Sequence, residues 1–497
     1  MVQIENLIEK TPSFKQITAD LQPKNHQLIT GISGSARTEL LSALSKEGQQ
    51  PILVVTDTIS HMQELASDLE NLLPANRVYQ FPVEEVLAAE VATSSPNYRL
   101  QRVLALNALI NREPTVVVAS AAGLRRNIIS PEYFAQSSLK IKTGGEVDPA
   151  KIRQQLSAMG YQYQKMVLRP GDFAIRGSII DIYALNTDNP VRIDLFDTEV
   201  DSLRYFDAST QRSIDNVEEV QILPATDFII PATEFSRVYE ALDTEYKKVV
   251  KELSADDADI KQQVANRFEP LLNALKNQHL PNELLEFSNL VYPAKHSLFD
   301  YLPDDGTIYF DDLTRIKQFA KQMTQEDVGW FKDKVAHHQL TDVPDLSNDV
   351  STIIKKDLHP QIYGALFKKG LGNIKLSQIT DLKSRTMQRF FGQMPLLKAE
   401  LQRWIDQGQT VVLMANSPER RKQIAQTLAD FDITATETEL TNIKPNVVQI
   451  VAANLNNGFE MPLAGLVVIT ESEMFKQVKK VHHRPQQLAN AERLKNY

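Results

Sequence analysis

Short apolar runs alternate with amphipathic segments over the first 125 residues. Apolar, β-branched runs occupy residues 27–30, 51–56 and 115–120, and apolar side chains at helical spacing follow the first two runs, over 38–46 and 62–73. Buried β-branched strands separated by amphipathic helices are typical of a parallel sheet with helices on both faces. We therefore predict that the chain begins with an α/β domain.

The hydrophobic period falls to two between about residues 136 and 223, which is typical of strands. Helical spacing returns over 234–275, and a strand over 306–310 ends in two aspartates. This order predicts a small α+β module with one helix, at 149–159, inserted into the α/β domain. Its alternating stretches are 138–142, 173–183, 191–196 and 202–206.

A third unit follows a polar stretch at 339–351. It alternates helices and strands, at 389–407, 410–414, 418–431, 447–451 and 466–470. We therefore predict an interrupted α/β domain and a separate small α/β domain, to which we assign no chemistry. The predicted boundaries are 1–125 and 224–345 for the two parts of the interrupted domain, 126–223 for the insert, 346–372 for a linker, 373–475 for the small α/β domain and 476–497 for a basic linker.

The composition narrows the classes of function. With 54 basic and 63 acidic residues, the net charge of −9 does not favour nonspecific nucleic-acid binding. The chain has no cysteine, which excludes disulfides, thiolate catalysis and zinc–thiolate or iron–sulfur sites, and suits the reducing cytosol. We expect a cytoplasmic protein with no membrane partner, because no apolar run approaches a membrane span and the N-terminus lacks the order of a signal peptide. Two pairs of adjacent histidines complete no ligand pattern, so we predict no metal site.

A turn rich in small residues separates the first strand from the first helix, where a phosphate loop belongs. Gly31, Gly34 and Thr38 fit such a loop, but Ala36 stands in place of its second glycine and Arg37 in place of its lysine. A phosphate loop points backbone N–H groups at phosphate oxygens, with a lysine ammonium on the terminal phosphates and a hydroxyl on magnesium. The Cβ of Ala36 crowds that approach, and the guanidinium of Arg37 is a rigid fork rather than a compact charge.

The second half of a nucleotide site would be an acidic pair at a strand end. Asp311 and Asp312 follow the strand predicted at 306–310, but an Asp–Glu order is usual, and aspartate is one methylene short for positioning water. The alternative is a turn that only caps a helix and a strand that ends in a solvated acidic loop. We predict a nucleotide-binding fold that has lost its nucleotide, with no catalytic residue and no cofactor bound by this chain.

Several segments together resemble two related families. The turn at 31–38, the runs 115–123 and 130–133, and the segments 171–183 and 191–196 are similar to the excision-repair protein UvrB. Over essentially the whole chain, the order of segments is closer to the N-terminal half of the bacterial transcription-repair coupling factors (the Mfd family). The further segments that fit this second family are 298–303, 455–460, 469–475 and 490–497.

This resemblance implies a degenerate helicase-like domain with an inserted UvrA-binding module. It implies a noncatalytic chain that recruits UvrA in transcription-coupled nucleotide excision repair. In that family a motor that uses ATP and magnesium translocates on DNA and displaces stalled RNA polymerase. We expect this chain to be a fragment, with the motor and the contacts with polymerase and DNA in domains that would follow the basic linker.

The resemblance also places a UvrA-binding surface on the insert. Arg176 matches a position in the surface of UvrB that binds UvrA, and the other candidates lie near it: Phe173, Gly177, Arg169, Arg192 and Arg204. Arginine is favoured where a planar fork pairs with carboxylates at an interface, and Gly177 allows close approach. Phe173 and Arg176 fall on opposite faces of an unbroken strand, so a bulge or twist is needed for both to contribute. The alternative for each arginine is a solvated surface charge.

Two rival functions stay open from the sequence. One is an active helicase-superfamily ATPase with an unusual phosphate loop, and the other is a UvrB-like protein that binds damaged DNA. UvrB probes damage with an aromatic-rich hairpin, but the corresponding stretch here, 78–99, offers only Tyr79, Phe81 and Tyr98 among several glutamates. Because binding of single strands relies on several stacked aromatics in a basic groove, this stretch disfavours direct reading of damage.

Overall fold

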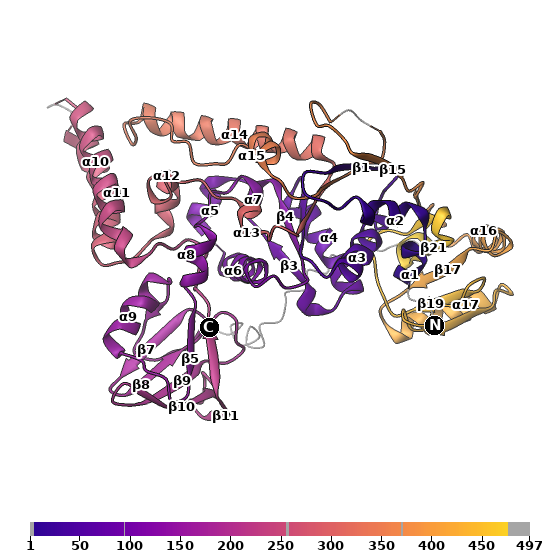
Figure 1. Ribbon diagram of the computed structural model, residues 1–497, viewed down its shortest axis with the longest axis horizontal. Helices are drawn as coiled ribbons and strands as arrows, with labels where there is room; N and C mark the ends of the chain where they lie inside the picture. The colour runs from indigo at the N-terminus through magenta and orange to yellow at the C-terminus, as the bar shows by residue number, and fades with distance from the viewer. Residues whose placement is uncertain (1–3, 94, 255–257, 369–370, 476–497) are drawn as a thin grey trace.

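The computed structural model describes residues 4–93, 95–254, 258–368 and 371–475, which form three connected parts (Figure 1). An interrupted α/β domain lies in the middle, the insert projects from one end of it, and the small α/β domain packs at the other end. The predicted fold class, with a large parallel sheet, is confirmed. The predicted basic linker at 476–497 lies outside the described residues. Within the described ranges, no helix is long and apolar enough to cross a membrane.

Seven parallel strands form the sheet of the interrupted domain, in the order β15-β1-β14-β13-β2-β4-β3. Strands β2 and β4 are buried along their full length because helices cover both faces of the sheet, which explains their continuous apolar runs. The strands are β1 (His26–Thr30), β2 (Ile52–Thr56), β3 (Val78–Phe81), β4 (Val116–Ser120), β13 (Thr307–Asp311), β14 (Gln361–Gly364) and β15 (Gln378–Asp381).

The helices of this domain pack on two separate cores, one on each face of the sheet. Along β2, Leu53 and Val55 belong to one core, and Val54 belongs to the other. The helical segments are α1 (Ile4–Glu9), α2 (Pro12–Ala19), α3 (Ala36–Gly48), α4 (Ile59–Leu72), η1 (Ala75–Arg77), α5 (Leu87–Thr93), α6 (Pro96–Ile110), α7 (Ala121–Arg125), α13 (Leu298–Tyr301), α14 (Leu313–Ala336) and α15 (Val350–Lys356).

The structure corrects the predicted linker at 346–372. That stretch contains α15 and the buried strand β14, which lies between β1 and β13 in the sheet. The next strand, β15, pairs with β1 at the edge of the same sheet and not with the small α/β domain predicted to begin at 373. Four-residue strands carry too little periodicity to be recognised locally, since it is their parallel pairing with β1 that defines them.

The insert contains a six-stranded sheet and a two-stranded ribbon. The larger sheet has the order β11-β10-β9-β8-β7-β6 and is antiparallel except between β6 and β7. The stretch 173–183 forms a hairpin, with Gly177 in the turn at a left-handed φ of +61°. The elements are α8 (Pro131–Gln136), β5 (Leu139–Lys142), α9 (Pro149–Ala158), β6 (Gln162–Tyr163), β7 (Asp172–Arg176), β8 (Ile179–Ile182), β9 (Val191–Phe196), β10 (Glu199–Phe206), β11 (Ser213–Val217) and β12 (Glu219–Ile222).

A helical arm leads from the insert back to the sheet, as the helical spacing over 234–275 predicts. Its two long helices pack against each other, and Tyr246 stacks on Phe268 between them. The arm consists of η2 (Ala232–Glu234), α10 (Phe235–Glu252), α11 (Ala258–Lys276), η3 (Asn282–Phe287) and α12 (Ser288–Val291).

The small α/β domain has a sheet of its own, in the order β16-β20-β21-β17-β19-β18. Its first helix begins at Met394 rather than at residue 389, because proline is tolerated in the first turn of a helix but not in its interior. The elements are β16 (Arg385–Thr386), α16 (Met394–Asp406), β17 (Thr410–Met414), α17 (Pro418–Ala429), β18 (Ala435–Thr438), β19 (Val448–Val451), β20 (Phe459–Met461), η4 (Pro462–Ala464), β21 (Leu466–Thr470) and α18 (Glu471–Met474).

Candidate functional site

The outer face of the insert's sheet gathers three of the predicted arginines. Arg204 is registered opposite Arg192, and Arg192 is registered opposite Asp181. Arg176 lies two residues beyond Ala174, which is paired with Asp181, so its side chain points to the same face. We call Arg176, Arg192 and Arg204 the arginine face. The opposite face of the sheet packs on the core of the insert.

Two aspartates hold the arginine face together. The fully buried Asp181 accepts hydrogen bonds from Arg192 Nε at 2.7 Å and Nη2 at 2.9 Å, and it also pairs with Arg176. Asp194 pairs with Arg204 at 2.6 Å. The side chain of Arg176 remains 46% exposed, against 14% for Arg192 and 28% for Arg204. Arg176 therefore has the most exposed side chain of this face.

The other candidates of the insert lie elsewhere. Phe173 is fully buried in the insert's core, and β7 pairs with β8 without a bulge that would turn this ring outward. This corrects the assignment of Phe173 to a binding surface, because strand alternation sends it and Arg176 to opposite faces. Gly177 forms the hairpin turn in open space. Arg169 lies in the loop before β7, where its backbone N–H donates to Asp172 Oδ2 at 3.1 Å.

Sequence reasoning missed one exposed aromatic residue on the arginine face. Phe196 ends β9 and is 77% exposed. Burial alternates along this strand, so Phe196 shares the outward face with Arg192 and Asp194. The signal was present in the sequence, since an aromatic residue at an outward position of an alternating strand is not needed for the core.

The phosphate turn, residues 31–38, connects the end of β1 to the start of α3. Gly31 and Gly34 have left-handed φ values of +63° and +53°. The polar backbone groups of the turn bond to the protein itself. The N–H of Ser33 donates to Ser384 Oγ at 3.2 Å, and the N–H of Ser384 donates to the carbonyl of Gly31 at 2.7 Å.

The structure brings Arg37 of the phosphate turn to Asp311 at the end of β13, where the two form an ion pair. Burial lowers the pKa of the Arg37 guanidinium, but the charge and hydrogen bond of Asp311 outweigh burial, so the pKa is raised. Asp312 caps α14 and accepts a backbone hydrogen bond from its first turn at 3.3 Å. The two groups that a nucleotide site would direct at phosphate and magnesium therefore neutralise each other.

The remaining residues of the turn face the interior. Ala36 and Thr38 are fully buried, and the Thr38 hydroxyl has no hydrogen-bond partner among the residues that the structure describes. No group of three or more histidine or acidic side chains within the described ranges could hold a metal ion.

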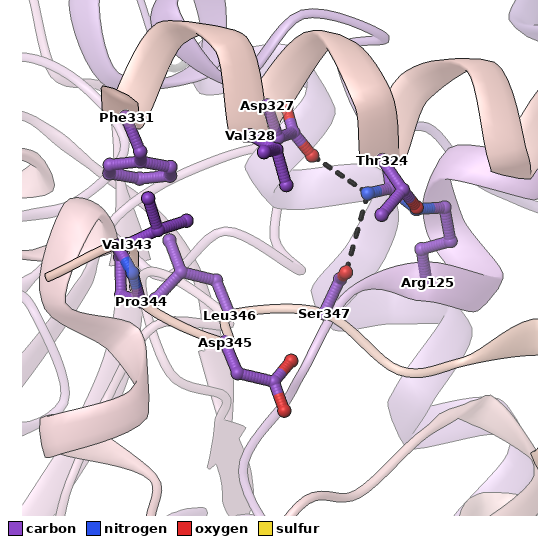
Figure 2. Close-up of a pocket in the computed structure, with 10 residues that line it drawn as sticks. All are labelled: Arg125, Thr324, Asp327, Val328, Phe331, Val343, Pro344, Asp345, Leu346 and Ser347. Carbon is purple, nitrogen blue, oxygen red and sulfur yellow. Dashed lines mark hydrogen bonds and ion pairs between the residues drawn. The ribbon is translucent and has the colours of Figure 1, made fainter. Parts of the chain in front are cut away.

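A pocket of about 220 Å³ lies between α14 and residues 343–347 (Figure 2). Figure 2 shows Arg125 at its rim, where the guanidinium donates to Asp327 at 2.7 Å and to Ser347 at 3.3 Å. The opposite wall is apolar and includes Val328, Phe331, Val343 and Leu346. The pocket contains none of the predicted site residues, and the charge of Arg125 is already balanced by Asp327.

The fold and the arginine face define a helicase-like α/β protein with an inserted interaction module. Comparison with known families agrees, because the model of the UvrB interaction domain matches residues 139–228. The model of the MFD D3 domain matches residues 406–474, within the small α/β domain.

Comparison with individual proteins shows which relatives this chain is similar to. The chain is 35% identical over 504 residues to the transcription-repair-coupling factor of Bacillus subtilis (strain 168), 28% over 500 residues to that of Staphylococcus aureus (strain USA300) and 29% over 496 residues to that of Staphylococcus haemolyticus (strain JCSC1435). These alignments cover 99–100% of this chain but 42% of each relative. The resemblance is confirmed: the chain is a homologue of a portion of the transcription-repair-coupling factors and carries their UvrB-homology module.

Proposed function

We propose that this chain recruits UvrA through the arginine face, in transcription-coupled nucleotide excision repair. The observation that carries the proposal is the gathering of three arginines on one outer face of the matched UvrB interaction domain. Asp181 anchors Arg192 and leaves Arg176 half exposed, so a partner can pair with Arg176 while the sheet stays intact. The expected counterpart is a surface of UvrA that carries carboxylates.

Arg176→Ala tests this proposal. We expect the affinity for UvrA, measured by titration calorimetry, to fall about 30-fold or more, because truncation of a charged anchor commonly costs about 2 kcal/mol. The melting temperature stays unchanged because Arg192 keeps Asp181 paired.

Lys151→Ala is the matched control for this experiment. It removes the same charge from the same module, and its side chain is 80% exposed with only a 3.9 Å contact to Asp148. We expect UvrA to bind this variant as it binds the unmodified chain. If the Arg176 and Lys151 variants bound UvrA with equal affinity, the arginine face would not be the UvrA-binding surface.

The same proposal treats this chain as noncatalytic, with no bound ATP or magnesium. It also treats the chain as a cytoplasmic protein, because the absence of cysteine suits a reducing compartment. Support comes from the Arg37–Asp311 ion pair and from the buried methyl group of Ala36. The ATP-driven motor would lie in the part of the longer relatives that this chain does not span. The same part would bind RNA polymerase and DNA.

Calorimetry with magnesium-ATP, and an ATPase assay in the presence of DNA, test the noncatalytic role against the rival ATPase. We expect no heat of binding at micromolar affinity and no turnover above that of an Arg37→Ala variant. A salt-dependent gel shift with damaged DNA tests the UvrB-like rival, which requires binding to DNA by this chain alone.

A further inference from the structure

A loop of the small α/β domain lies directly on the phosphate turn. The loop consists of residues 455–459, and its two ends, Leu455 and Phe459, are buried in the core that also contains Ala36 of the turn. The N–H of Asn457 donates to Ser35 Oγ at 3.2 Å. The loop therefore joins one of the two cores of the interrupted domain to the sheet of the small α/β domain.

Asp68, on α4, holds the turn and the loop together. It is buried, and its Oδ2 accepts a hydrogen bond from Ser35 Oγ at 2.7 Å. Its Oδ1 accepts two hydrogen bonds from Asn456, from the backbone N–H at 2.8 Å and from Nδ2 at 2.9 Å. One carboxylate thus bonds a residue of the turn with one oxygen and a residue of the loop with the other.

The fit between the turn and the loop is close. A Cβ built on Gly34 would stand 3.5 Å from the Cβ of Asn457, which is ordinary van der Waals contact. The turn is also bonded to Ser384, which lies where the chain enters the small α/β domain. Ser384 accepts a hydrogen bond from the N–H of Ser33 and donates one to the carbonyl of Gly31. The turn is therefore held from two sides by segments that belong to, or lead into, the small α/β domain.

We propose that the phosphate turn has become the docking site of the small α/β domain, with loop 455–459 as its occupant and Asp68 as the positioning residue. In this proposal the turn holds the loop in place of phosphates, through the Ser35 hydroxyl that accepts the hydrogen bond of the Asn457 N–H. Docking fixes the small α/β domain to the interrupted domain as one body, which gives a role to a domain whose own fold shows no chemistry. This proposal does not depend on UvrA binding.

An engineered disulfide tests the docking. The chain has no cysteine, so the pair Gly34→Cys and Asn457→Cys introduces the only two thiols. A separation of 3.5 Å between the two Cβ positions lies within the range that a disulfide requires. We expect mild oxidation to form the bond nearly completely, as measured by thiol titration and mass spectrometry.

The control pair is Gly48→Cys with Asn457→Cys. Gly48 is the last residue of α3, the helix that follows the phosphate turn, and lies about 18 Å from the start of that helix. We expect no disulfide within the monomer of this control. Because Gly34 has a left-handed φ, Ser35→Cys with Asn457→Cys serves as a second pair if the first does not fold. Folded protein in which neither test pair oxidises faster than the control would overturn the proposal.

The role of Asp68 is tested in the cross-linking background. We expect Asp68→Ala to slow disulfide formation about tenfold or more, because the loop loses the acceptor of two hydrogen bonds. Asp68→Asn keeps an acceptor oxygen and restores most of the rate. A rate that is unchanged by Asp68→Ala, or equally slow in both variants, would refute the positioning role.

Discussion

Four charged side chains are buried together at the root of the insert. Arg102 Nη2 lies 2.9 Å from Asp227 Oδ1 and 3.2 Å from Glu90 Oε1. Arg126 Nη2 lies 3.0 Å from Asp227 Oδ2, and its Nη1 lies 2.9 Å from Glu90 Oε1. Arg126 follows α7, where the chain leaves the sheet for the insert, and Asp227 follows β12, where it returns. The network therefore ties together the two ends of the insertion.

Asp227→Ala removes one of the two carboxylates and leaves Glu90 as the single carboxylate beside two guanidinium groups. Arg102 and Asp227 are each only 1% exposed, so the unpaired guanidinium is left away from bulk water. Burial alone would raise the pKa of Asp227, but Arg102 and Arg126 outweigh it and lower the pKa, so the carboxylate is ionised in the folded protein. Removing one partner of such a buried pair costs about 3–5 kcal/mol, and we expect the free energy of unfolding of the interrupted domain to fall by that amount.

Urea unfolding followed by tryptophan fluorescence measures this effect. The chain has two tryptophans, and Trp330 lies on α14 of the interrupted domain, so a Trp404→Phe background isolates its signal. Asp345→Ala is the control, because this carboxylate is 83% exposed and its 2.7 Å contact with Lys295 is worth about 1 kcal/mol or less. If Asp227→Ala cost no more than the control, the argument from burial would be refuted.

Two further predictions concern Asp68 beside the phosphate turn and Phe196 beside the arginine face. Burial raises the pKa of Asp68 from 3.8 to about 6, so the folded state binds a proton more tightly than the unfolded chain. This contribution to stability is fully present below pH 3.8 and is lost as the pH rises through 6. We expect Asp68→Asn to abolish that part of the pH dependence. The measurement is the urea midpoint of each protein at pH 5 and at pH 7, and the change between the two pH values is expected to be smaller for the variant than for the unmodified chain. Phe196→Ala is expected to weaken UvrA binding roughly tenfold at an unchanged melting temperature, since the ring is 77% exposed beside the arginine face; unchanged calorimetric affinity would exclude this ring from the interface.

The elements that the sequence predicts best are those whose burial leaves a local pattern. The apolar runs at 27–30, 51–56 and 115–120 correspond to β1, β2 and β4, because strands buried on both faces need no polar positions. The alternation along 191–196 corresponds to β9, whose inward residues are all buried. The arginine face follows from the same alternation, once the register of neighbouring strands is known.

Features that depend on distant pairing could not be predicted in this way. Strand β14 lies in the interior of the sheet, yet it is only four residues long and is defined by its neighbours β1 and β13. The buried position of Phe173 depends on the unbroken pairing of β7 with β8. The partner of Arg37 became evident only when the fold placed the end of β13 beside the phosphate turn. Periodicity shows which face a residue occupies but not which residue stands opposite.

The arginine face and the docked small α/β domain lie at opposite ends of the interrupted domain, and the order of strands in the sheet explains why. Ligands of open α/β sheets usually bind at the carboxyl ends of the strands. Here the ends of β1 and β13 are occupied by the Arg37–Asp311 pair and by loop 455–459. The insert leaves the sheet after β4, on the far side from the small α/β domain (Figure 1). A partner on the arginine face therefore need not displace the docked domain, because the insert and the small α/β domain contact the interrupted domain at opposite ends (Figure 1).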